Sequence, residues 1–285
     1  MTNNNSNYNR KAQVFIVATP IGNKADFSHR AIEILKQVDI IACEDSRTSA
    51  NLLETYGIDT KLVSYHKFNE KQRTLEFLKL IDEGKTIALI SDAGTPCVSD
   101  PGRVLVKDFY ERGVKITSIP GASAVTTFVS MIPRNSEEFA FVGFLPRVKS
   151  QQQKLFEKYL STDLVFYESP QRLLETFENI KAIRGESSRV AVGRELTKMF
   201  EETQTGTVQE MIEYYKNHTL KGEIVCLLYS DESDSDDDIA ILENIKKLKS
   251  LKYSDKDISQ ILNVLYGVNK NKVYKLSLST LSVSE

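Results

Sequence analysis

The segment TIALISDAGTPCVSDPG, residues 86–102, and the later segment VKITSIPGASA, residues 114–124, decide the predicted fold. The first begins with five apolar or β-branched residues, typical of a buried strand, and continues into the small residues of Ser91–Pro96. A second turn at Ser99–Gly102 opens a helical pattern, and a third at Pro120–Ala124 closes the next strand. Small residues let a ligand approach the backbone, and helix N-termini offer free N–H groups. These turns therefore predict a ligand-binding edge.

The first predicted strand also ends in a turn, ATPIGN at residues 18–23, in which Pro20 and Gly22 form a rigid, close-approach corner. The turn does not match the G-x-G-x-x-G dinucleotide fingerprint, and the chain lacks the G-x-x-x-x-G-K-[ST] motif of nucleoside triphosphate sites. In α/β sheets, ligands bind beyond the carboxyl ends of the strands. We therefore expect this turn to meet the other small-residue turns at one sheet edge.

Strand and helix patterns alternate along most of the chain, which is typical of a mainly parallel sheet covered on both sides. A break at Met131–Ser136 divides the alternation into two expected α/β domains, residues 13–132 and 133–230. The expected strands are Val14–Ala18, Asp39–Ala42, Lys61–Ser64, Thr86–Ile90, Val114–Ser118, Phe139–Val142, Asp163–Tyr167, Arg189–Gly193 and Glu223–Leu228. The expected helices are Ser28–Gln37, Arg47–Tyr56, Asn69–Glu83, Gly102–Arg112, Lys149–Leu160, Gln171–Ile183 and Thr207–Tyr215.

The two ends of the chain differ from this pattern. Residues 1–12 are polar and Asn-rich, which predicts a disordered lead-in rather than a signal peptide. Residues 231–238 hold six acids, which predicts a solvated linker whose last aspartates could also cap a helix beginning near Ile239. Residues 239–285 carry eight lysines against four acids and predict three short helices, the last two being Asp255–Tyr266 and Lys270–Ser279. Such a small helical domain suits nucleic-acid contact or a dimerisation and packing module equally.

The overall composition sets limits on function. The 285 residues have 41% hydrophobic and 27% charged content and a net charge of −2, so the chain is globular and not basic overall, although a local basic face stays open. The thiols of Cys43, Cys97 and Cys226 lack metal-ligand spacing and are expected to be reduced in a cytoplasmic protein, and no metal site is predicted. No apolar run approaches the roughly 20 residues that span a bilayer.

Two polar strand ends in the first half are candidates for chemistry. Asp45 and Arg47 follow the second strand and suit a general base with an anchoring cation; alternatively, Asp45 or Ser46 caps the next helix and Arg47 pairs locally. His66 follows the third strand and either contacts substrate or is structural. The run Tyr65–Phe68 would suit a surface that stacks a base and grips a phosphate.

The second half has comparable strand ends. FVGFLPR at 141–147 and YESPQRL at 167–173 could surround a flat heteroaromatic ligand, with Phe144 and Leu145 as an apolar wall. Arg194 and Glu195 either join this site or pair with each other between strands. The chain shows no nucleophile–base motif, which favours a reaction whose cofactor supplies the reactive group while the protein orients the reactants.

Taken together, the motifs resemble those of the tetrapyrrole methylase superfamily, over roughly residues 14–230. The tail from Lys252 also resembles the small helical domain that follows in some members. Ala18 and Ala122 depart from the common Gly and Pro but remain small. The matching segments are VATPIGN (17–23), ACEDSRTS (42–49), SYHKFNE (64–70), SDAGTPCVSDPG (91–102), IPGASA (119–124), FVGFLPR (141–147), YESPQRL (167–173), GRELTKMFEE (193–202) and KGEIV (221–225).

The resemblance implies an α/β fold whose two domains hold S-adenosylmethionine in a cleft. It implies a homodimer with no membrane association that methylates the ribose 2′-hydroxyl of a cytidine in 16S ribosomal RNA of the small subunit. The cofactor contacts that it implies are Pro20, Asp92, Ala93, Gly94, Thr95, Pro96, Val98, Ser123, Ala124, Leu145 and Glu195. For this reaction Asp45, His66 and Asp100 are candidate bases, with Arg47 and Lys198 as phosphate or oxyanion partners.

Two rival functions stay open on the residues alone. The first is methylation of a small molecule such as a tetrapyrrole precursor, which needs a closed apolar pocket rather than a basic surface. The second is RNA or ribosome binding without catalysis, against which the intact turns argue. RNA is favoured by the basic residues Lys67, Lys71, Arg73, Arg147, Lys149 and Lys154 and by the basic tail.

Overall fold

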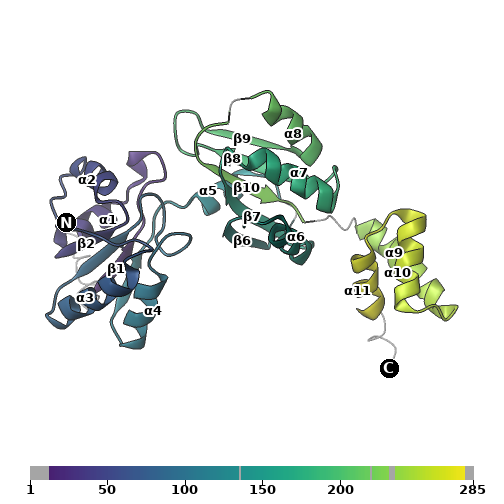
Figure 1. Cartoon of the computed structure of the whole chain (residues 1–285), viewed down its shortest axis with the longest axis horizontal. Coiled ribbons are helices and arrows are strands. Elements are labelled where there is room, and N and C mark those ends of the chain that lie inside the picture. The colour runs from purple at the N-terminus through teal and green to yellow at the C-terminus, as the bar shows by residue number, and fades with distance from the viewer. Residues whose placement is uncertain (1–12, 135, 219, 231–234, 280–285) are drawn as a thin grey trace, which may run out of the picture. The chain divides into compact units, whose positions relative to one another are not determined.

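The computed structural model describes residues 13–134, 136–218, 220–230 and 235–279 (Figure 1). The chain separates into two compact units, residues 1–230 and 231–285. The expected lead-in at residues 1–12 lies outside the described residues. Every expected strand is confirmed to within two residues at each end, as is every helix expected between residues 28 and 215.

The first sheet is parallel throughout, as its sequence pattern predicted. Its strands lie in the order β3-β2-β4-β1-β5, so the first strand of the chain is near the centre. The carboxyl ends of all five strands therefore lie at one edge of the sheet. The strands are β1 (Val14–Val17), β2 (Ile40–Cys43), β3 (Leu62–Ser64), β4 (Ile87–Ile90) and β5 (Ile116–Ile119).

Helices cover both faces of this sheet because its strands are apolar on both sides. Alternate residues such as Phe15 and Val17 pack with α1 (His29–Gln37) and α2 (Ser46–Glu54). The intervening residues pack with α3 (Glu70–Asp82) and α4 (Arg103–Glu111) on the other face. A 3₁₀ turn, η2 (Lys24–Asp26), joins β1 to α1. The helices therefore lie on the two faces of the sheet (Figure 1), and the small-residue turns lie at the ends of its strands.

The second sheet is mixed rather than parallel, with the order β6-β7-β10-β8-β9. β6 pairs with β7 in parallel, and the remaining neighbours are antiparallel. One face packs against the three later helices and the other against α5 (Ala124–Met131). The strands are β6 (Phe139–Phe144), β7 (Asp163–Glu168), β8 (Arg189–Arg194), β9 (Glu202–Thr207) and β10 (Ile224–Leu228), and the helices are α6 (Lys149–Lys158), α7 (Leu173–Arg184) and α8 (Val208–Lys216).

The second unit is helical and has its own small core. Its helices are α9 (Ser235–Ser250), α10 (Asp255–Tyr266) and α11 (Lys270–Ser279), the last two with the expected bounds. Ile245, Ile258 and Val273 form the centre of the core. α9 begins at Ser235, four residues before the expected start, so residues 235–238 of the expected linker are helical. Residues 231–234 of that linker lie outside the described residues.

Candidate functional site

Three of the small-residue turns meet at the carboxyl edge of the first sheet, as predicted. Thr19, after β1, forms a backbone bridge with Gly94, after β4, and its hydroxyl donates to the Ser91 carbonyl at 3.0 Å. The Thr95 hydroxyl in turn donates to the carbonyl of Ala122, after β5, at 3.1 Å. Each turn is therefore tied to its neighbour by hydrogen bonds that a ligand would not have to form or break.

A cavity of about 410 Å³ opens at these turns, within the size range of small-molecule sites. Its other side is formed by the ends of β6, β7 and β8 and by the start of β10, through Phe144, Tyr167, Gly193 and Ile224. Phe144 therefore lines the cavity, which is where the expected apolar wall would place it. Eight of the residues implied by the resemblance or proposed as bases line the cavity: Asp92, Ala93, Gly94, Thr95, Val98, Asp100, Ser123 and Ala124.

The turn between β4 and α4 depends on a glycine that no other residue could replace without strain. Gly102, at the N-cap of α4, has a φ of +132°, which side chains rarely adopt. A Cβ atom there would lie 2.7 Å from Cδ2 of Leu89 in the sheet. The backbone of this turn therefore packs directly on the sheet, which holds Asp100 at the cavity.

Carboxylates give the cavity a negative side. Burial, followed by the nearby charges of Glu44 and Asp92, raises the pKa of Asp100 to about 6. Burial and the charge of Asp45 also raise the pKa of Asp92. Two carboxyl groups with raised pKa values therefore line one cavity. With a pKa of about 6, Asp100 can exchange a proton near pH 7.

Aromatic rings form the opposite wall. Phe144 lies 5.4 Å from Tyr167 between ring centroids, and Phe141 packs edge-on against Tyr167 at 5.0 Å. Burial, then the charges of Asp100 and Glu223, raise the pKa of Tyr167 to about 12. The Tyr167 phenol thus stays protonated beside the carboxylates and can donate a hydrogen bond into the cavity.

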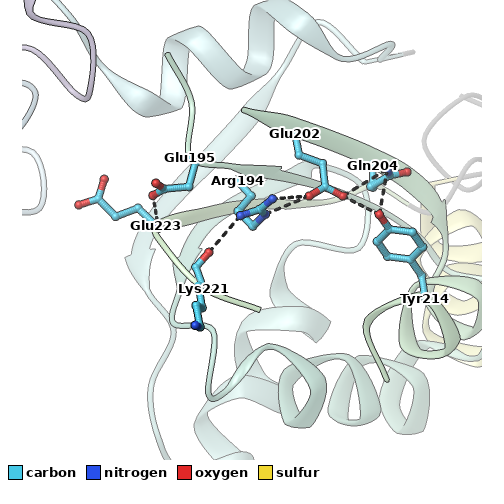
Figure 2. Close-up of polar contacts among 7 residues, drawn as sticks. All are labelled: Arg194, Glu195, Glu202, Gln204, Tyr214, Lys221 and Glu223. Carbon is cyan, nitrogen blue, oxygen red and sulfur yellow. Dashed lines mark hydrogen bonds and ion pairs between the residues drawn. The ribbon is translucent and has the colours of Figure 1, made fainter. Parts of the chain in front are cut away.

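A polar network holds the turn that precedes β10 (Figure 2). The Arg194 guanidinium donates to the Lys221 carbonyl at 3.3 Å and binds Oε2 of Glu202 through Nε and Nη2, at 2.9 and 2.8 Å. Tyr214 donates to the other Glu202 oxygen at 2.7 Å. Since Gly222 and Glu223 line the cavity, Arg194 positions part of its wall through the backbone.

Glu195 holds the same turn from the other side. Its Oε1 accepts from the Glu223 N–H at 2.9 Å and from the Lys198 ammonium at 2.8 Å (Figure 2 shows the first contact). A Cβ atom on Gly222, whose φ is +93°, would clash with the Glu195 carboxyl group. The expected alternative of an Arg194–Glu195 pair is wrong, because Arg194 pairs with Glu202 and Glu195 with Lys198.

The Arg194–Glu202 pair should contribute measurably to stability, because both side chains are less than one quarter exposed. We expect Arg194→Gln to lower the free energy of unfolding in urea by about 1–3 kcal/mol at pH 7. Tyr214 and Arg194 lower the pKa of Glu202, so this stabilisation is present above the ordinary Glu value and is lost as pH falls through the lowered pKa. The difference between the variant and the unmodified protein should therefore shrink on acidification.

The matched control is Lys107→Gln, which removes an exposed 3.9 Å pair with Glu111. Such pairs contribute about 0–1 kcal/mol. Equal losses in the two variants would contradict a stabilising role for the network.

Several residues implied as cofactor contacts lie beside the cavity lining rather than in it. Pro20 is buried next to Ile21, and Pro96 is buried within the β4–α4 turn. Glu195 stands next to the lining residue Leu196 and holds the Lys221–Glu223 turn. The expectation that Leu145 is part of the apolar wall is wrong, because its side chain packs into the core under the second sheet.

The other candidate bases have structural partners. Asp45 caps α2 by accepting from the Arg47 N–H at 2.8 Å, which confirms the capping alternative. Both ring nitrogens of His66 lie 3.3 Å from donors in its own turn, the N–H of Phe68 and the amide of Asn69. Lys198 pairs with Glu195 and Glu223. Asp100 is the candidate base whose side chain lies at the cavity.

One further prediction concerns the surface. Tyr65 is 1% exposed, with its ring stacked on Phe77, so its expected place on a base-stacking surface is wrong. Within the described residues, no cluster of His, Cys, Asp or Glu side chains has the arrangement of a metal site. Nor does that part of the chain contain a helix long and apolar enough to cross a membrane.

The sequence matches one family model and relatives that carry the same name. A family model described as Tetrapyrrole (Corrin/Porphyrin) Methylases matches residues 13–212. Ribosomal RNA small subunit methyltransferase I of Escherichia coli O157:H7 is 38% identical over 275 residues, which cover 95% of this chain and 96% of that protein. The protein of the same name from Rickettsia prowazekii is 39% identical and covers 88% of this chain and 90% of its own length.

Solved structures with low sequence identity share the fold. Diphthine synthase matches with a TM-score of 0.61 at 14% identity, over 76% of this chain and 89% of that chain. Uroporphyrin-III-C-methyltransferase from Thermus thermophilus matches with a TM-score of 0.52 at 17% identity, over 75% and 93%. The expected α/β fold with two sheets is thereby confirmed.

Proposed function

The chain belongs to the tetrapyrrole (corrin/porphyrin) methylase family, and we propose that it is an S-adenosylmethionine-dependent methyltransferase of 16S ribosomal RNA. Its acceptor is the ribose 2′-hydroxyl of a cytidine in the small subunit. The observation that carries this proposal is the cavity where the β1, β4 and β5 turns meet, with the Asp100 carboxyl group at its side. Similarity over nearly the whole chain to methyltransferases of small-subunit ribosomal RNA supports the substrate.

The cavity suits the cofactor in shape and charge. Ala93, Gly94 and Ser123 present backbone with little side chain, against which a nucleoside can lie. Ile21, Leu196 and Val225 add apolar surface from both sheets. When bound, S-adenosylmethionine supplies an electrophilic methyl group on a positively charged sulfur. The carboxylates of Asp92 and Asp100 favour such a cation by direct electrostatic attraction.

Asp100 is the proposed general base. The 2′-hydroxyl is a poor nucleophile, and a carboxylate within hydrogen-bond reach can accept its proton as the oxygen attacks the methyl carbon. The raised pKa of Asp100 makes it a stronger base than an ordinary aspartate while leaving most of it ionised at pH 7. The products are the 2′-O-methyl ribose, S-adenosylhomocysteine and a proton on Asp100.

Exposed basic residues, as well as the names of the relatives, favour RNA over a tetrapyrrole as the substrate. Lys67, Lys71, Arg147, Lys149 and Lys154 are all exposed on the first unit, where they can meet phosphates. Arg73, also expected to favour RNA, instead pairs with Glu76. We place the enzyme in the cytoplasm, where its ribosomal substrate is made.

We also propose that the enzyme acts as a homodimer. Met199 and Phe200 are 90% and 67% exposed in the segment between β8 and β9. Adjacent apolar side chains with this exposure suit burial against a second copy of the chain. Sedimentation equilibrium tests this by giving the mass of the enzyme in solution.

Two measurements on the purified chain test the proposed function. Calorimetry should show one S-adenosylmethionine bound per chain, because the described cavity can hold one such ligand. Incubation with radiolabelled S-adenosylmethionine and small subunits from cells lacking the gene should label ribosomal RNA in a form that ribonuclease releases. Absence of cofactor binding would support RNA binding without catalysis, and label in a small molecule that survives ribonuclease would support the tetrapyrrole-type rival.

A further inference from the structure

Phe68 is an aromatic side chain presented to solvent at the edge of the sheet that carries the cavity. It is 94% exposed, the highest value among the exposed large apolar side chains of the described residues. It lies between β3 and α3, and therefore at the carboxyl edge of the first sheet. A phenyl ring that stays exposed to solvent gains no stability from burial when the chain folds. A ligand that covers the ring would account for its position.

The turn that carries Phe68 is held in place by hydrogen bonds. The Asn69 side chain accepts from the His66 N–H at 2.8 Å and donates to the Ser64 carbonyl at 3.1 Å. The Phe68 N–H points to Nδ1 of His66 at 3.3 Å, and the two rings meet edge to face with centroids 6.1 Å apart. The ring of Phe68 is thus presented on a rigid turn, which lowers the entropic cost of binding a flat ligand.

Basic residues lie close to Phe68 in the chain and on the neighbouring strand end. Lys67 and Lys71 are exposed on either side of Phe68 in the chain. Arg47 follows β2, the strand next to β3; its side chain is 93% exposed and pairs with Asp45 at 3.8 Å. An exposed aromatic ring with flanking cations is the arrangement that binds single-stranded nucleic acid, because bases stack on the ring while phosphates meet the charges.

We propose that Phe68 stacks on an unpaired base of the RNA substrate, beside the nucleotide whose ribose enters the cavity, while Lys67 binds a backbone phosphate. This inference rests on the proposed function and adds the residue that holds the RNA next to the reacting ribose. His66 is then a positioning residue for the Phe68 turn rather than a base. Stacking tolerates any base, so Phe68 increases affinity without selecting sequence.

The test compares Phe68→Ala with Phe68→Tyr in methylation of small subunits. Loss of the ring should raise KM for the subunits by roughly tenfold to hundredfold, and Phe68→Tyr should restore it, because stacking needs a ring. The Kd for S-adenosylmethionine should be unchanged in both. The control is Tyr110→Ala, which removes a 79% exposed ring from the last turn of α4, at the opposite edge of the sheet.

Several outcomes would overturn the proposal. An unchanged KM in Phe68→Ala, or an equal increase in Tyr110→Ala, would show that the ring does not bind RNA. If Phe68→Ala has a different mass from the unmodified enzyme on sedimentation, Phe68 contacts a second copy of the chain instead. If the unmodified chain binds S-adenosylmethionine but transfers no methyl group to RNA, the proposed function is wrong. The proposal that Phe68 stacks on the RNA substrate is then wrong as well, because it rests on that function.

Discussion

Asp100→Asn is expected to lower kcat for ribose methylation by about 10²- to 10⁴-fold, the usual contribution of a general base. The change replaces a carboxylate that accepts a proton with an amide of nearly the same shape that does not. Burial holds the pKa of Asp100 near 6, so kcat of the unmodified enzyme should rise with pH through about 6 and level off as the carboxyl group ionises. Asp100→Asn should lose this rise. Single-turnover rates between pH 5 and 8 measure both effects.

The control for this prediction is Asp82→Asn, which makes the same chemical change at an exposed position in the last turn of α3. Its rate and pH profile should match those of the unmodified enzyme. Calorimetry on Asp100→Asn separates catalysis from cofactor binding, since the amide also removes a charge near the sulfonium. A rate loss without loss of the pH-dependent rise would show that Asp100 supplies only electrostatic attraction.

Ala93→Trp is expected to abolish detectable binding of S-adenosylmethionine and, with it, methyl transfer. Ala93 lines the cavity from the turn after β4, and its side chain is exposed, so an indole ring can extend into the cavity without entering the core. The ring would occupy space that the cofactor needs. Titration calorimetry measures the loss directly, and denaturation in urea should give a free energy of unfolding close to that of the unmodified chain.

Ala182→Trp is the matched control, because Ala182 is also exposed, on α7, but lies outside the cavity lining. It should bind S-adenosylmethionine with an unchanged Kd. If Ala93→Trp also binds with an unchanged Kd, the cofactor site is elsewhere on the chain.

The first sheet and its turns were predictable because local signals agree with one another. The apolar strand before Ser91 ends in small residues that both stop the strand and form the cavity. Parallel strands place such ends at one edge, so the meeting of the turns followed from topology. The backbone bridge between Thr19 and Gly94, which are 75 residues apart in the chain, confirms that these turns meet.

Other parts of the site depend on contacts that no local pattern indicates. β9 was missed because ETQTGT is polar and takes strand form by pairing with β8. Because the partner of Arg194 is on β9, the sequence could not predict that Arg194 pairs with Glu202 rather than with the adjacent Glu195. Tyr65 and Phe68 lie in the same polar run, and the sequence predicted that both are exposed. Only the structure shows that Tyr65 is buried against Phe77 while Phe68 is exposed.

The central claim is that this chain methylates one ribose of small-subunit RNA through the cavity at the β1, β4 and β5 turns. Mass mapping of 16S ribosomal RNA from cells lacking the gene, then supplied with the unmodified gene, Ala93→Trp or Ala182→Trp, tests it most directly. The account predicts that one cytidine 2′-O-methyl group is absent without the gene, returns with the unmodified gene and Ala182→Trp, and stays absent with Ala93→Trp. An unchanged set of ribose methyl groups in cells lacking the gene would contradict it.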